Sequence, residues 1–131
     1  MQLIKKPVPL VIASILMVLL GLARGFGGVV LLLHGKAALS EIIADESAIT
    51  CVSVGLILIG IFEIISAVGV FYLKRKYWLL GIIVTILFVI NGAVNGYFLF
   101  GKPGDSGTIV NIIVALIIIT FLIFGRKSLK N

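Results

Sequence analysis

The sequence predicts an all-α polytopic membrane protein: a four-transmembrane-helix bundle with both termini in the cytoplasm. First, 61% of the 131 residues are hydrophobic and 12% are charged, whereas soluble domains have roughly 45–50% and about 25%. Second, four apolar stretches approach the roughly 20 residues that cross a bilayer. Third, the lysines and arginines lie at the ends of these stretches. That is the pattern of membrane topology, and it argues against a nucleic-acid partner despite the net charge of +6.

The four expected helices share a long apolar run, and they cover about residues 9–33, 48–73, 78–100 and 108–124. Lys5 and Lys6 precede the first run, as they would in a signal peptide. However, this run exceeds the roughly 7–15 apolar residues of a signal sequence, and no small-x-small cleavage site follows it. We therefore expect a retained helix, and a single transmembrane domain over residues 1–131.

The connections between these stretches differ in kind. Residues 34–47, HGKAALSEIIADES, are polar and acidic, and their spacing is compatible with a short interfacial helix in an outer loop. Residues 74–76, KRK, predict a tight basic turn. Residues 101–107, GKPGDSG, predict a turn because glycine and proline interrupt helices while aspartate and serine favour local turns.

The distribution of basic residues predicts the orientation. If all four helices span, eight cations lie on one side: Lys5, Lys6, Lys74, Arg75, Lys76, Arg126, Lys127 and Lys130. The other side carries Lys36 and Lys102 together with four acidic residues. Because the cytoplasmic side keeps the excess of lysine and arginine, both termini are predicted to lie inside the cell.

Arg24 is the exceptional residue of the first apolar stretch, LLGLARGFGGVVLLL. It lies about 22 Å from the inner edge of its helix, at 1.5 Å per residue. A charge at such depth costs about 2.5–3.5 kcal/mol on insertion scales and normally has a partner. The other charge expected within the membrane is Glu63, in LIGIFEIISAVG, about 22 Å below the outer start of its own helix. Since consecutive helices are usually neighbours, we expect an Arg24–Glu63 ion pair.

The role of this pair has two interpretations. It could be a structural contact that fixes the register of two helices. It could instead form an ion, proton or substrate site, because intramembrane ionisable groups are often functional. A separate alternative is that Arg24 extends its guanidinium to the outer headgroups.

Three asparagines extend the expected intramembrane polar site. Asn91 and Asn95, in VINGAVNGYF, are four residues apart and therefore share one helix face. Asn111 lies near the outer start of the fourth helix. These amides either hydrogen-bond between helices, at about 0.6 kcal/mol each, or line a vestibule open to the outside with Glu63 near its floor.

Two glycine pairs predict helix packing. Gly21 and Gly25 are four residues apart, as are Gly92 and Gly96. Small residues at this spacing let helix backbones approach closely. The spacing leaves open whether the contact lies within one chain or between chains.

Neither catalysis nor a cofactor is indicated. His34 and Cys51 are the sole residues of their types, so no metal set or disulfide is expected. The glycines lie within apolar helices, which does not suit a phosphate-binding loop. No serine is placed as an activated nucleophile. We therefore expect no enzyme, no metal and no cofactor.

Residues 62–82, FEIISAVGVFYLKRKYWLLGI, combine a glycine-containing apolar helix end, a basic cluster and an aromatic residue leading into the next helix. This arrangement resembles a recurring element of small, uncharacterised four-helix membrane proteins of bacteria and archaea. The resemblance implies a fold and a prokaryotic cell membrane, and it implies no activity. The acidic first helix of small multidrug exporters and the threonine-rich phenylalanine motif of fluoride channels are absent.

Two functions fit these observations. The first is a non-enzymatic helix-packing protein, either an accessory subunit of a membrane assembly or a homo-oligomer, with lipids and other membrane proteins as partners. The alternative is a small transporter or channel that uses the polar site of Arg24, Glu63 and the asparagines.

Overall fold

The computed structural model describes residues 7–34, 46–100 and 105–129, with the side chains of 46, 98–100 and 105–108 left aside. Within these ranges the chain is helical and contains no strand. The helices are, in order, α1 (Val8–His34), α2 (Glu46–Phe71), α3 (Arg75–Phe100), α4 (Asp105–Phe124) and the short 3-10 helix η2 (Arg126–Ser128). The interfacial helix expected within 34–47 falls mostly outside the described residues, as do residues 101–104 of the turn expected over 101–107. The rest of that expected turn is wrong, because residues 105–107 already belong to α4.

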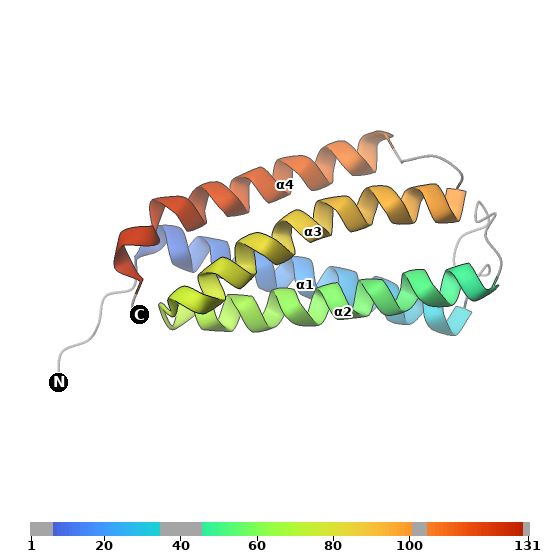
Figure 1. Ribbon diagram of the computed structural model, residues 1–131, viewed down its shortest axis with the longest axis horizontal. Coiled ribbons are helices and arrows are strands. Elements are labelled where there is room, and N and C mark those ends of the chain that lie inside the picture. Colours follow the sequence, from blue (N-terminus) through green and yellow to red (C-terminus); the bar gives the residue numbers. More distant parts are fainter. Residues whose placement is uncertain (1–6, 35–45, 101–104, 130–131) are drawn as a thin grey trace.

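The four α-helices form an elongated bundle in which successive helices run in opposite directions (Figure 1). The start of α1, the turn between α2 and α3, and the end of α4 lie together at one end of the bundle. We call this the basic end, because it holds five of the six described lysines and arginines: Lys74, Arg75, Lys76, Arg126 and Lys127. The opposite end, where α1 finishes and α2 begins, is the loop end.

Three of the helices are long and apolar enough to cross a membrane. These spans are Val8–His34, Ser47–Phe71 and Arg75–Tyr97. The fourth helix is shorter, and its apolar part is Ile109–Phe124. For the described residues the prediction of an all-α protein is confirmed, and three of its helices are long and apolar enough to span a membrane.

The turn expected over residues 74–76 is wrong in its position. α2 ends in a Schellman motif, in which Leu73 N–H donates to the Val70 carbonyl and Lys74 N–H donates to the Gly69 carbonyl. Leu73 occupies the left-handed position with φ 63°, where glycine is usual. The reversal is therefore complete before Arg75, which already belongs to α3. Burial of the Leu73 side chain against other helices compensates for its strained backbone.

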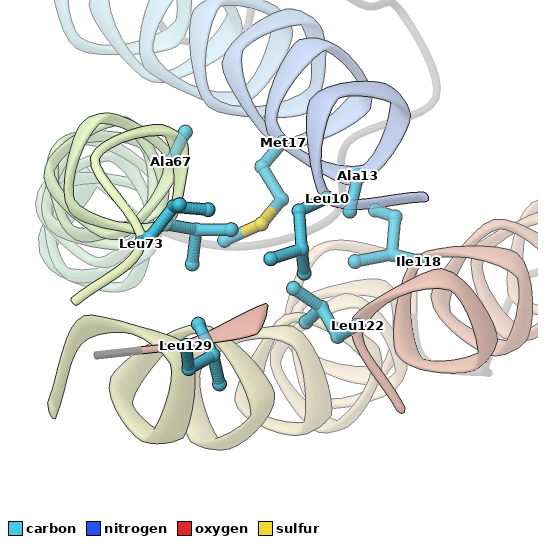
Figure 2. Packing of buried hydrophobic residues seen from close by; sticks show 9 residues of the cluster. Leu10, Ala13, Met17, Ala67, Leu73, Ile118, Leu122 and Leu129 are labelled. Atoms are coloured by element: carbon cyan, nitrogen blue, oxygen red, sulfur yellow. The ribbon is translucent and has the colours of Figure 1, made fainter. Parts of the chain in front are cut away.

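The basic end has a dry core (Figure 2). Its buried residues come from α1, α2, α4 and the segments that follow α2 and η2: Leu10, Ala13, Met17, Ala67, Val70, Leu73, Ile118, Leu122 and Leu129. At its edge, Trp78 Nε1 donates a hydrogen bond of 2.8 Å to the Leu122 carbonyl, which links α3 to α4. This packing closes the basic end. The buried serines beside it, Ser14 and Ser66, each donate to a carbonyl of their own helix.

The backbones of α1 and α2 are in contact at glycines. A Cβ atom added at Gly60 would lie 2.6 Å from the Gly21 carbonyl oxygen and 2.8 Å from the Gly25 nitrogen. One added at Gly28 would lie 2.8 Å from the Ser53 carbonyl oxygen. Any side chain at these positions would push the backbones apart. Gly21 therefore faces α2 of the same chain, whereas Gly25 contacts α2 through its backbone and a Cβ atom on it would meet nothing within 4 Å.

Candidate intramembrane polar site

Glu63 lies at the centre of the bundle with 0% of its surface exposed. Its Oε1 accepts a hydrogen bond of 3.2 Å from Thr85 Oγ1 on α3. Its Oε2 is buried and has no hydrogen-bond partner. On the α1 side, a Cβ atom at Gly21 would come within 3.3 Å of the Glu63 Cβ. The carboxyl group is thus enclosed by three helices with one oxygen unsatisfied.

The other buried polar side chains on α1 and α2 differ from Glu63. Ser14, Ser53 and Ser66 each donate to the carbonyl four residues earlier in their own helix, at 2.7–2.8 Å. Such a bond satisfies the hydroxyl without any other helix. An ionised carboxylate has no equivalent local solution, because it only accepts hydrogen bonds and the helix interior offers it no free N–H.

The expected Arg24–Glu63 ion pair is wrong. The Arg24 guanidinium lies over the ring of Phe88 on α3, with its Cζ 4.2 Å from the ring centroid. Among the side chains that the structure describes, none forms an ion pair with Arg24. The reason is direction: Gly21 faces α2, and Arg24, three residues later, projects about 60° away from that line at 100° per residue.

Arg24 instead lines an open cleft of about 420 Å³. Its walls are Leu20 and Ala23 of α1, Phe88 of α3 and Asn111 of α4. A Cβ atom at Gly92 would lie 3.2 Å from Arg24 Nη2 and would collide with Asn111 Nδ2. The absence of a side chain at Gly92 therefore makes the room in which Arg24 and Asn111 come together.

The other two asparagines form a separate pair. Asn95 Nδ2 donates a hydrogen bond of 2.8 Å to Asn91 Oδ1. Asn91 Nδ2 lies 3.5 Å from the position of a Cβ atom on Gly55, which places the pair against α2. The five predicted polar residues thus separate into three groups: the enclosed Glu63, the α2-facing Asn91 and Asn95, and the cleft of Arg24 and Asn111.

The remaining predicted residues lie at the periphery. His34 is the exposed last residue of α1, and Cys51 is exposed and free on α2. Gly96 is half-buried on α3. No group of three potential metal ligands occurs among the described side chains.

Sequence reasoning missed two residues of these sites, Thr85 and Phe88. Both lie on the face of α3 that begins at Gly81 and ends at Gly92, with spacings of four, three and four residues. Such spacing places them on one side of a helix. The pattern was present in the sequence, but α3 is apolar around much of its circumference, and nothing marked this face as the inner one.

Comparison with known proteins adds no assignment: no family model, no curated protein and no solved structure matches the chain.

Proposed function

We propose that this protein is an integral protein of the cell membrane that crosses the bilayer four times with both termini in the cytoplasm. The grouping of five of the six described lysines and arginines at one end of the bundle supports this orientation, since the cytoplasmic side keeps the excess of cations. α4 has 20 residues, which gives about 30 Å of helix, enough for the hydrocarbon core.

Labelling of single cysteines tests the orientation. In a Cys51→Ala background, Ser47→Cys at the loop end should react with a membrane-impermeant maleimide added to intact cells. Ser128→Cys at the basic end should react only after the cells are permeabilised. Reaction of both sites in intact cells would contradict the proposed topology.

For its activity, we propose a small transporter or channel for an ion or small solute. The observation that carries this proposal is the Oε2 atom of Glu63, which is buried among three helices without a partner. An unsatisfied carboxyl oxygen in a membrane interior is unfavourable. Glycine contacts already bring α1 and α2 together, so packing does not account for a carboxyl group there. An ion pair with Arg24 would have supplied a structural explanation, and that pair is not formed.

Currents from reconstituted protein test this activity. Proteoliposomes on a solid-supported membrane are exposed in turn to gradients of H⁺, Na⁺, K⁺, chloride and inorganic phosphate. The wild type should give a current with at least one of them, and Glu63→Gln should abolish it while the protein remains folded. Ser53→Ala is the matched control, because Ser53 is equally buried but bonds its own helix. The proposal would be contradicted if the wild type gave no current with any of these gradients, or if Glu63→Gln gave the same current as the wild type.

A second candidate is the accessory subunit or homo-oligomer. Ala23 and Gly27 are exposed on α1 and four residues apart, and a Cβ atom at Gly27 would meet nothing within 4 Å. This face could receive a helix from another chain. If so, Gly27→Leu should dissociate an assembly purified in mild detergent, as measured by sedimentation. An unchanged sedimentation profile would remove this candidate.

A further inference from the structure

The side chain of Arg24 carries a positive charge that no described carboxylate neutralises. Glu63 holds the one carboxyl group among the described side chains, and its Oε1 bonds Thr85. Arg24 nevertheless remains half-buried, within a helix long and apolar enough to span a membrane. A guanidinium in this position is unfavourable unless an anion or a polar surface accompanies it.

The cleft around Arg24 is arranged to hold such an anion. The Arg24 Cζ lies over the Phe88 ring, 4.2 Å from its centroid, in a cation–π contact. The Asn111 amide lies on the opposite helix, α4, and can add a donor beside the guanidinium. Gly92 keeps the space between the two free of a side chain. Donors from two helices thus converge on a cleft of about 420 Å³, which is large enough for a phosphate or carboxylate group.

We infer that the Arg24 cleft binds an oxyanion, a phosphate or carboxylate group, between α1, α3 and α4. A guanidinium presents a planar fork of N–H donors that matches two oxygens of such a group. Arg24 is ten residues before the end of α1, about 15 Å from the loop end, and Asn111 is about 9 Å from the start of α4. The anion therefore belongs to the leaflet, or the aqueous side, at the loop end.

The identification of this oxyanion as the transported solute rests on the proposed transport function. Two sources could supply the same chemistry: the headgroup of an anionic lipid, or a soluble anion. Binding can be measured without any flux, so the two proposals can fail separately.

The test is binding to the full-length protein in dodecyl maltoside. Native mass spectrometry counts bound phosphatidylglycerol, and calorimetric titration measures binding of inorganic phosphate or acetate, with chloride at equal ionic strength as the reference. The wild type should bind at least one of these probes. Arg24→Gln should weaken that binding by about ten- to hundredfold, the effect of losing hydrogen bonds to a charged group. Arg24→Lys should retain part of it because the charge remains.

A matched variant separates a specific site from general attraction. Arg126→Gln removes the same charge from an exposed position at the basic end and should leave binding unchanged. Lipid binding that depends on Arg24 identifies a headgroup, and phosphate or acetate binding that depends on it identifies a soluble anion. If wild type and Arg24→Gln bind the lipid equally and also bind the soluble anions equally, the inference is overturned, even if the wild type gives currents. If binding depends on Arg24 but no current is found, the anion site stands and the transport proposal fails.

Discussion

Glu63 and Arg24 lie within about one helical turn of each other along the bundle, yet their surroundings are opposite in kind. Glu63 is enclosed where α1 and α2 are in backbone contact, and its one partner is Thr85. Arg24 lies on the side where α1 faces α3 and α4 across an open cleft, and it contacts an aromatic ring. Membrane proteins usually pair opposite charges at similar depth. Here two neighbouring charges are held on different sides of α1, which indicates separate roles.

The enclosure of Glu63 depends on the glycine contact, so Gly60→Ala should have the largest effect. The new Cβ would meet only backbone atoms, at 2.6–3.1 Å, and backbone cannot move aside as a flexible side chain can. We expect a loss of about 3 kcal/mol in unfolding free energy, the upper end for overpacking. SDS titration from mild detergent measures it. Gly27→Ala, which meets nothing, should stay near wild type; equal losses in both variants would show that the contact is not specific.

Thr85→Val should have the next largest effect on the enclosed site. Valine has nearly the same shape as threonine, so the change removes the hydroxyl that donates to Glu63 and leaves both carboxyl oxygens without a donor. We expect a loss of about 1–3 kcal/mol in unfolding free energy. In the double variant Thr85→Val/Glu63→Leu most of this loss should disappear. If Thr85→Val is as stable as wild type, the hydrogen bond does not stabilise the site.

The helices follow from the sequence more readily than the directions of their side chains. Counting residues along apolar runs locates the helices and the level of Arg24 along α1, because the rise per residue is fixed and a membrane span needs about 20 apolar residues. Counting residues does not show how each helix is oriented about its own axis, that is, which side chains face the neighbouring helices. In a soluble protein the exposed polar face of a helix shows which side is buried, but here both the exposed and most of the buried positions of the helices are apolar. Gly21 and Gly28, seven residues apart, carry the signal that was overlooked, since both face α2 and direct Arg24 away from it.

The turn at Leu73 illustrates a second limit. A left-handed residue at a helix end predicts glycine or asparagine, and the chain has leucine there. Its side chain is buried in the core of the basic end, a tertiary contact that no local pattern reveals. The end of α2 was therefore predicted too late and the start of α3 later than it occurs.

The asparagine pair should contribute less than either feature of the enclosed site. Asn95→Leu removes a single amide hydrogen bond to Asn91, and we expect a loss of about 0.6 kcal/mol in unfolding free energy, the average for such bonds in membranes. The same SDS titration measures it. A loss as large as that of Thr85→Val would mean that the pair belongs to the site of Glu63.

Arg24→Leu should change stability least, because the side chain borders an open cleft. The lost cation–π contact is worth about 0.5–1 kcal/mol, and removal of a charge from the membrane offsets part of that. We expect a net change below about 0.5 kcal/mol in unfolding free energy, with no effect on the yield of folded protein. Aggregation of this variant on purification would contradict the assignment of Arg24 to an open cleft.

A double-mutant cycle between Arg24 and Glu63 tests the separation of the two charges most directly. The unfolding free energies of wild type, Arg24→Gln, Glu63→Gln and the double variant are measured by SDS titration in one detergent. Because the two side chains make no contact, the effects should add within about 0.5 kcal/mol. A coupling of several kcal/mol, with the double variant recovering what each single change loses, would show that the charges pair in the membrane and would contradict their assignment to separate sites.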